Sequence, residues 1–358
     1  MKSAPAAAGT RVDTRAFLEK LPKWVIVILP VAHWVLMSLR HRAAVLPSVA
    51  NPKITSGGLV GEGKTEYFRI MGVVARAVTA PNGSFVVHTE RAAADAAACM
   101  QAAGLAFPII AKPDIGWCGF GVRRIDAPIE LADYLAAFPR SERVVLQAYV
   151  PDAGEAGVFY VRLPGETRGR VLGLALRYFP QVIGDGRHSI AELIAGDARL
   201  ARLGDPLHRS RIDPARIAAA GEVVRLATIG SSRVGGLYRN GEALITPQLT
   251  TAIDAVARDM DEFHFGRFDL RYASEVALME GRGFTIIEVN GAGSEAIEAW
   301  DPQTRPLAAF GKIMAKQVLL FRIAAANRKR GFEPMGFLAL AKLHLNQQRL
   351  IPLYPPSN

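Results

Sequence analysis

The chain has 358 residues, half of them hydrophobic, which is enough for two or three domains with their own cores and excludes a disordered protein. Its two cysteines, Cys99 and Cys118, lie in unrelated contexts, so no disulfide framework or zinc site is expected. The net charge of +10 is concentrated at the ends, because residues 1–50 contain seven Lys or Arg against two acidic residues and 312–358 contain eight against one. Since 51–311 carries a net charge of −2, we expect no nucleic acid as partner; the basic ends indicate an anionic surface such as a membrane.

The first predicted element is an apolar segment, 24–39, with basic residues on both sides. Its sixteen residues are fewer than the roughly twenty that span a bilayer, and Pro30 and His33 interrupt it. Trp24, Trp34 and the basic flanks are typical of a helix that lies in the membrane interface. The alternatives are a helix packed against the rest of the protein or against a second subunit of a homodimer. We therefore expect a cytoplasmic protein, with peripheral contact at the inner face of the membrane as one of these outcomes.

Beyond a loop over 46–65, the polarity pattern predicts helices and strands that alternate in an α+β manner. We expect helices at 66–79, 91–104, 128–138 and 189–197, and strands at 84–88, 107–113, 143–150, 157–163, 170–186, 266–272 and within 284–296. The expected organisation is a basic N-terminal segment (1–50), an N-terminal α/β substrate-side domain (51–104), two α+β subdomains (105–185 and 186–311) and a basic helical tail (312–358).

Residues 58–65, GLVGEGKT, match the phosphate-binding pattern G-x-x-x-x-G-K-[ST]. That pattern forms a phosphate cradle where it joins a buried strand to a helix. Here Pro52 and a pair of glycines precede it, and no apolar run does. The sequence therefore favours a chance match, although Lys64 is placed to reach an anion.

The most informative residues are Asp269, Glu288 and Asn290, in two runs that read as strands. Side chains two apart on a strand share a face, so Glu288 and Asn290 point the same way, as do Arg267, Asp269 and Arg271. If the two polar faces meet, three oxygen-bearing side chains converge beside a cation. Such hard ligands suit Mg²⁺ that also holds the phosphates of a nucleotide. The alternative is the solvated face of a hairpin.

Upstream, Lys112 ends an apolar strand just before a glycine loop. A lysine there can hold phosphates as a point charge, and Gly116, Gly119 and Gly121 let backbone N–H groups approach them. The strand–turn–strand over 144–162 then offers an apolar slot with backbone donors for an adenine ring, and an acid for the ribose hydroxyls. The residues of this hinge are Gln147, Ala148, Tyr149 and Val150, with Glu155 as the acid; the alternative for Glu155 is a solvated turn. Arg233, Ser231 and Ser232 are further candidates for an anion, with a surface loop as the alternative.

This order of features resembles the ATP-grasp superfamily, in its D-alanine–D-alanine ligase-like and carboxylate–amine ligase branch, over roughly 90–311. The resemblance implies an α+β ATP-grasp fold in which ATP lies between two subdomains and Mg²⁺, for which Mn²⁺ can substitute, bridges its phosphates. It assigns the phosphates to Lys112, the adenine to 147–150 and the ribose to Glu155. It assigns the metal to Asp269, Glu288 and Asn290, and the transferred phosphoryl group or the oxyanion to Arg267. The glycine loop departs from the family pattern at Trp117 and Cys118.

The expected function is an ATP- and Mg²⁺-dependent ligase that activates a small-molecule carboxylate as an acyl phosphate for attack by an amine. A carboxylate is a poor electrophile until phosphorylation gives it a leaving group, and positioned cations can neutralise the charge that develops. Two alternatives remain open. One is a phosphotransferase of the same fold that performs no ligation, and the other is a membrane-associated scaffold that binds a nucleotide without turnover.

Overall fold

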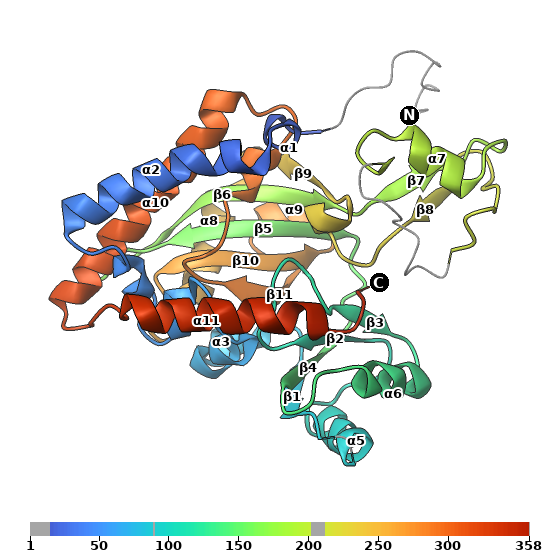
Figure 1. Cartoon of the computed structure of the whole chain (residues 1–358), viewed down its shortest axis with the longest axis horizontal. Helices are drawn as coiled ribbons and strands as arrows, with labels where there is room; N and C mark the ends of the chain where they lie inside the picture. The colour runs from blue at the N-terminus through green and yellow to red at the C-terminus, as the bar shows by residue number, and fades with distance from the viewer. Residues whose placement is uncertain (1–14, 89, 202–211, 358) are drawn as a thin grey trace.

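The computed structural model describes residues 15–88, 90–201 and 212–357 (Figure 1). Two antiparallel sheets, of four and five strands, form the body of the protein, with helices packed against them and a separate two-stranded ribbon. The predicted α+β class is confirmed by this mixture of helices and antiparallel sheets.

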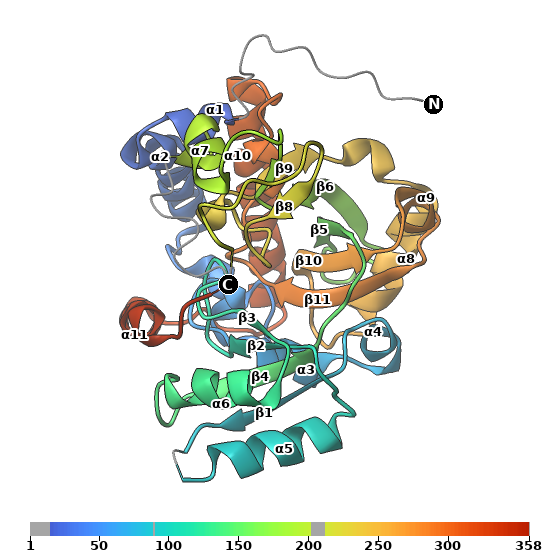
Figure 2. The ribbon, with the colours of Figure 1, turned by 90° about the vertical axis from the view of Figure 1, so that its right-hand side faces the viewer.

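The smaller sheet has the strand order β1-β4-β2-β3. Its strands are β1 (Asn82–Val86), β2 (Ile109–Pro113), β3 (Arg123–Ile125) and β4 (Arg143–Ala148). Helices α5 (Ala92–Ala102) and α6 (Pro128–Ala136) cover one face of it, as Figure 2 shows below the strands. Alternation in the strands places Ile109 and Leu146 on this covered face, where they pack with Leu131 and Leu135 of α6. The opposite face of the smaller sheet is turned away from α5 and α6, toward the remainder of the protein.

The larger sheet has the strand order β11-β10-β5-β6-β9. Its strands are β5 (Gly154–Val161), β6 (Arg170–Tyr178), β9 (Leu237–Asn240), β10 (Phe265–Tyr272) and β11 (Phe284–Asn290). Helix α8 (Pro247–Arg258) covers one face, where Phe268 and Leu270 of β10 pack with Leu249 and Ile253. Beside it, α9 (Glu275–Met279) follows β10.

The other face of the larger sheet is half apolar and half polar. At its apolar end Phe159 and Phe265 pack against Phe321 of α10 (Pro306–Lys329). Further along the same strands the outward positions change to Glu155, Arg267, Asp269 and Arg271. Because side chains alternate along a strand, the polar residues face the same way as the apolar ones that α10 covers. This uncovered polar half is where a site can form.

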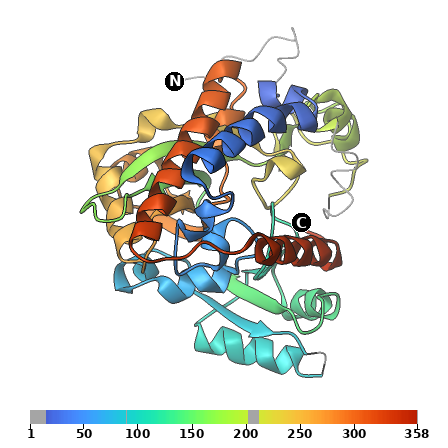
Figure 3. The ribbon, with the colours of Figure 1, turned by 60° about the vertical axis from the view of Figure 1, so that its left-hand side comes forward.

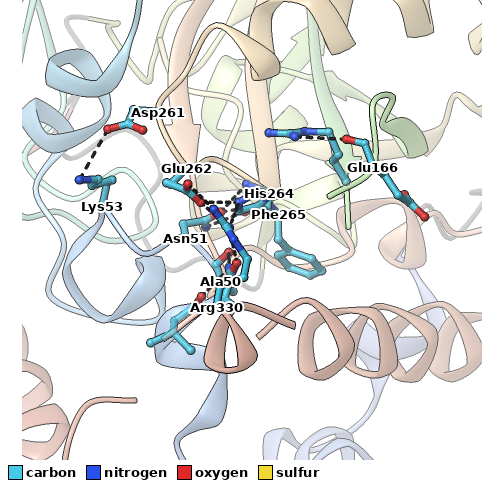
Figure 4. Close-up of polar contacts among 12 residues, drawn as sticks. Ala50, Asn51, Lys53, Glu166, Asp261, Glu262, His264, Phe265 and Arg330 are labelled. Carbon is cyan, nitrogen blue, oxygen red and sulfur yellow. Dashed lines mark hydrogen bonds and ion pairs between the residues drawn. The ribbon is translucent and has the colours of Figure 1, made fainter. Parts of the chain in front are cut away.

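A buried amide fixes the start of β10, two residues before Arg267. The side-chain oxygen of Asn51, which is fully buried, accepts from the backbone N–H groups of His264 and Phe265, at 2.8 and 3.0 Å. Its amide nitrogen donates to the carbonyl groups of Gly57 and Phe265. Figure 4 shows this contact beside the ion pair between Glu262 and Arg330, whose closest atoms are 2.6 Å apart. The N-terminal loop, β10 and the end of α10 are thereby joined.

The remaining helices lie around the two sheets. Helix α1 (Phe17–Lys20) precedes α2 (Lys23–His41), which packs along α10 (Figure 3). Helix α7 (Ile190–Gly196) packs on the ribbon of β7 (Gln181–Ile183) and β8 (Val223–Arg225), and α11 (Phe337–Leu350) precedes the C-terminus. The helix predicted over 66–79 is instead two, α3 (Lys64–Ile70) and α4 (Val73–Ala77). The break is stabilised by Asp259, whose carbonyl and carboxylate accept from the N–H groups of Gly72 and Ala75.

Sheet pairing runs across two of the expected domain boundaries. Strand β1 pairs with β4, so 82–102 joins the smaller sheet and forms no separate N-terminal α/β unit with 51–80. Strands β5 and β6 pair with β10 and β9, so 154–178 belongs to the larger sheet. Both differences have one cause: strands choose partners by hydrogen bonding in three dimensions, which order along the chain does not specify.

Candidate functional site

A cavity of about 450 Å³ lies between the smaller and larger sheets. That size is within the range of small-molecule and cofactor sites. Its walls come from β2, β4, β5, β6, β10 and β11, from the glycine loop after β2, from 59–67 and 228–232, and from α11. Of the residues predicted for the nucleotide, the metal and the phosphoryl group, all but Gly121 line it; they are Lys112, Gly116, Gly119, Gln147, Ala148, Tyr149, Val150, Glu155, Arg267, Asp269, Glu288 and Asn290.

The two polar strand faces meet as neighbouring strands of one sheet. In the antiparallel register of β10 and β11, Asp269 is opposite Glu288 and Arg267 is opposite Asn290. Asn290 Nδ2 donates to Asp269 Oδ2 at 3.3 Å. The pairing shifts by one residue directly after Asp269, which is a β-bulge. Two carboxylates and an amide therefore share one wall of the cavity.

Asp269 is held between two arginines. Arg267 Nε and Nη2 donate to its two carboxylate oxygens at 2.6 and 3.0 Å, and Arg177 Nη1 lies 3.0 Å from Oδ2. Burial alone would raise the pKa of this carboxyl, but the guanidinium groups of Arg267 and Arg177 hold it below its ordinary value. Asp269 is thus an anion whose charge two cations already balance.

Glu155 lies on the same wall, one strand further along the sheet. It is 4% exposed, and its two oxygens face Arg177 Nη1 at 3.1 Å and Arg271 Nε at 3.2 Å. The structure therefore brings Glu155 to the cavity but pairs both of its oxygens with arginine. Contact with ribose hydroxyls would have to replace or share one of these ion pairs.

Lys112 projects into the cavity from the smaller sheet. Its Nζ donates to Gln147 Oε1 at 2.7 Å and to the carbonyl of Ile287 at 2.9 Å, so it bridges the two sheets. Burial lowers the pKa of Lys112 to about 8, against the opposing effect of the Glu288 carboxylate. Gln147 is consequently turned toward the lysine, while Ala148 to Val150 form the strand end beside it. Arg124 stacks over Tyr149, with 4.4 Å between the guanidinium and the ring centre.

The C-terminal segment holds the glycine loop over 116–121, a contact that the sequence did not reveal. Gln347 donates to the carbonyl of Gly116, and Tyr354 donates to that of Ile115. Ser357 donates to the carbonyl of Gly119. Gly121 turns away from the cavity, with its α-carbon against Pro113 and Tyr354. The tail expected only to be basic and helical thus adds to the site; its cavity-lining residues are His344, Gln347 and Gln348.

The segment that matches the phosphate-binding pattern also reaches the cavity. Lys64 begins α3, and its Nζ lies 3.5 Å from Glu288 Oε1 and 3.4 Å from the carbonyl of Asp114. From residue 15 to the start of α3 the structure contains no strand, so the segment is not a strand–loop–helix cradle, but its lysine is beside the acidic strands. Glu62 and Tyr67 also line the cavity, and their Oε2 and Oη atoms are buried without a hydrogen-bond partner. Burial raises the pKa of Glu62 to about 7.

Other candidates differ in their placement. Ser231 and Ser232 line the cavity, whereas Arg233 does not and donates to the carbonyl of Cys118 at 3.0 Å. Cys118 itself lines the cavity as an exposed residue of the glycine loop, where partial desolvation and the Glu295 carboxylate raise the pKa of its thiol. The chain also has two loop histidines, of which His188 pairs with Asp185 away from the cavity and His208 lies outside the described residues.

The donor set suits a phosphate-bound Mg²⁺ better than a metal held by protein alone. Among the described residues, no group of three or more His, Cys, Asp or Glu side chains is placed to hold a metal ion. Phosphate-bound Mg²⁺ needs only one or two carboxylates from the protein. Glu288 is a third exposed and Asn290 is half-buried, so both can offer oxygen, and Asp269 would share its charge with the two arginines. The residues present therefore fit Mg²⁺, provided that Asp269 can interact with the ion and with the two arginines together.

No protein-family model matches the chain, and no curated protein does. Among solved structures it is similar to a bifunctional glutathione synthetase from Pasteurella multocida, with TM-score 0.35 and 18% identity over 75% of this chain and 38% of that one. It is also similar to the VanG D-Ala:D-Ser ligase from Enterococcus faecalis, with TM-score 0.41 and 14% identity over 75% of this chain and 64% of that one. The chain thus spans less than two thirds of either.

At these TM-scores the two likenesses carry no argument about function. The fold itself is the one that the resemblance to the ATP-grasp superfamily implies. An antiparallel sheet with the lysine and the glycine loop faces a second antiparallel sheet with the acidic strands, and the cavity lies between them.

Proposed function

We propose that this protein is an ATP- and Mg²⁺-dependent ligase that joins a small-molecule carboxylate to an amine. The observation that carries the proposal is the convergence of Lys112, Arg267, Asp269, Glu288 and Asn290 on one cavity that also has a glycine loop and an apolar strand end. Cations, hard oxygen ligands and an apolar slot are what a metal–nucleotide complex requires. Both cysteines are free and the reaction consumes ATP, so we place it in the cytoplasm.

The nucleotide would lie along the cavity from the hinge to the acidic strands. Residues 148–150 would receive the adenine, and the backbone of the glycine loop would cover the phosphates. Lys112 and Lys64 supply positive charge to the phosphates, and Arg267 supplies it on β10 beside Asp269. Mg²⁺ held by Asp269, Glu288 and Asn290 would neutralise the charge on the phosphate oxygens.

The reaction would take place in two steps. A carboxylate oxygen of the acid attacks the γ-phosphorus, the bond to the β-phosphate oxygen breaks, and ADP leaves. The amine nitrogen then attacks the acyl carbon of the acyl phosphate, the carbon–oxygen bond breaks, and inorganic phosphate leaves. Arg267 is placed to stabilise the negative charge that develops in each step, without a covalent nucleophile from the protein.

The amine must lose a proton when it becomes an amide. Glu62 is the cavity carboxylate whose pKa is raised to about 7, so near neutral pH it exchanges a proton readily. Its unpartnered oxygen leaves it free to accept one. We assign Glu62 this role within the proposal.

The test is a screen of acid–amine pairs with Mg·ATP, scored by release of ADP and phosphate. ADP formation should require both an acid and an amine, and Glu288→Gln should lower it by about 10²–10³-fold through lost charge stabilisation. The matched control is Glu275→Gln, at an exposed carboxylate on α9. Turnover that Glu288→Gln leaves unchanged would sink the proposal.

The same screen separates the alternatives. A phosphotransferase would form a stable phosphorylated product with no need for an amine. A nucleotide-binding scaffold would be stabilised by Mg·ATP and release no ADP with any pair.

A further inference from the structure

Helix α2 presents an apolar face to the outside. With 100° between successive residues, its exposed side chains cover roughly half of the helix circumference. No charged residue occurs between Trp24 and Leu39. The most exposed members are Trp24 (68%), Val27 (51%), Ile28 (52%), Val31 (51%), Val35 (51%), Leu36 (60%) and Leu39 (71%). Contiguous exposed apolar surface of this kind marks an interaction site rather than chance exposure.

The opposite face of α2 is fixed to the body of the protein. Trp34 packs edge-on against Phe321 of α10, with 5.0 Å between ring centres, and His33 Nδ1 lies 2.6 Å from Gln317 Oε1. Met37 is buried in the same cluster as Phe321. Figure 3 shows α2 lying along the outside of α10. The helix is therefore an ordered surface element, neither a core helix nor a loose segment.

These contacts decide between lying on a bilayer and crossing it. Among the described residues, α2 contains the one 18-residue stretch apolar enough to span, Trp24–His41. At 1.5 Å per residue this stretch is about 27 Å long, slightly less than the hydrocarbon thickness. Spanning would also carry His33 and Gln317, which are hydrogen-bonded to each other, into the hydrocarbon. A helix pinned along one side to α10 can instead place its free face in the membrane interface.

The charges at the ends of α2 favour lipid over a second copy of the chain. Exposed cations flank the apolar face, with Lys20 before it and Arg40 and Arg42 after it. In a parallel or an antiparallel pair of α2 helices, the cations of one copy would meet cations of the other. Like charges held together at an interface disfavour that pairing. Anionic lipid headgroups carry the opposite charge and would attract the cations at both ends.

We propose that α2 docks this protein on an anionic membrane surface, with Trp24, Ile28 and Val35 in the interface and the flanking cations on the headgroups. This docking is independent of the proposed ligase activity. A failure of either one leaves the other standing, because vesicle binding is measured without ATP.

The test is flotation of the full-length protein with vesicles of phosphatidylcholine containing phosphatidylglycerol, and with vesicles of phosphatidylcholine alone. We expect binding to the anionic vesicles that weakens with salt and is at least about tenfold weaker without the anionic lipid. Ile28→Glu and Val35→Glu should each reduce binding about tenfold or more. The matched control is Val73→Glu on α4, where an 83% exposed valine lies away from α2.

A second measurement needs no charged substitution. Lipids brominated in their acyl chains should quench the fluorescence of Trp24, and Trp24→Phe should remove most of that quenching. Vesicle binding that Ile28→Glu and Val73→Glu lower equally would overturn the proposal. The proposal would also be overturned if the protein did not bind vesicles and light scattering showed a dimer that Ile28→Glu dissociates.

Discussion

Replacing Lys112 with methionine separates a binding role from a structural one. Lys112 is 5% exposed, and its ammonium donates to Gln147 Oε1 and to the carbonyl of Ile287. If the role of Lys112 is structural, its loss should lower the free energy of unfolding. If Lys112 holds phosphates, its loss should chiefly lower the affinity for Mg·ATP.

The structure sets the size of both effects. The fall in the pKa of Lys112 from 10.5 to about 8 means that burying its charge costs about 3 kcal/mol, which methionine would recover. Against this, two buried acceptors lose their donor, at about 1–3 kcal/mol each. The two effects partly cancel, so we expect the free energy of unfolding to change by no more than about 3 kcal/mol. Affinity for Mg·ATP should fall about 10–100-fold, because hydrogen bonds to charged groups are worth about 1.5–3 kcal/mol.

Urea unfolding and calorimetric titration with Mg·ATP, on the same preparations, give the two quantities. The matched control is Lys53→Met, which removes an exposed lysine that pairs with Asp261 and does not line the cavity. It should change neither. Lys112→Met that unfolds more than about 4 kcal/mol more easily, yet binds Mg·ATP as tightly as the wild type, would refute the reasoning.

Four further predictions concern the same molecule. Mg·ATP affinity should weaken as the pH rises through 8, because Lys112 loses its charge, and calorimetry from pH 7 to 9 measures this. Because of Lys112, the free energy of unfolding should also rise with pH between about 8 and 10.5. In that range the unfolded chain binds a proton that the native chain lacks. Asn51→Ala should lower the free energy of unfolding by about 3–5 kcal/mol, measured in urea, because four buried backbone groups lose their partner. Gln347→Ala should speed amide hydrogen exchange in 116–121 several-fold, since the carbonyl of Gly116 loses its donor from α11.

The pH dependence of affinity, Asn51→Ala and Gln347→Ala each have a control. Lys112→Met should abolish the pH dependence of affinity, and an unchanged profile would show that another group titrates. Asn82→Ala, at a half-buried amide that makes a single hydrogen bond, should cost about 1 kcal/mol or less. Gln348→Ala, one position from Gln347 and exposed, should leave loop exchange unchanged; a stable loop in Gln347→Ala would show that Tyr354 and Ser357 suffice to hold it.

Local pattern was enough to predict most strands and the faces of the acidic ones. The alternation in 266–272 correctly separates Arg267 and Asp269 from Phe268 and Leu270, because burial on one face of a sheet imposes a period of two. The fold class follows from the same pattern. The candidate residues from Lys112 to Asn290 that line the cavity lie on predicted strands, in the glycine loop or in the turn between two predicted strands, where the local pattern singles them out.

The features of the site that could not be predicted from the sequence depend on contacts between distant segments. Nothing in the run around Arg177 predicts that it lies between Glu155 and Asp269, because that ion pair follows from the pairing of β6 with β5 and of β5 with β10. The contact of Gln347 with the glycine loop joins residues 231 positions apart. Glu62 lies inside the segment that matches the phosphate-binding pattern, and nothing in that pattern predicts the burial that raises its pKa.

The central claim is that this cavity makes an acyl phosphate from a carboxylate and ATP. The direct measurement follows a heavy oxygen isotope from the carboxylate of an acid that supports ADP release in the screen. The account predicts that one labelled oxygen passes into inorganic phosphate for each amide formed, because the oxygen that attacks phosphorus leaves with it. Amide formation with unlabelled phosphate would contradict the account.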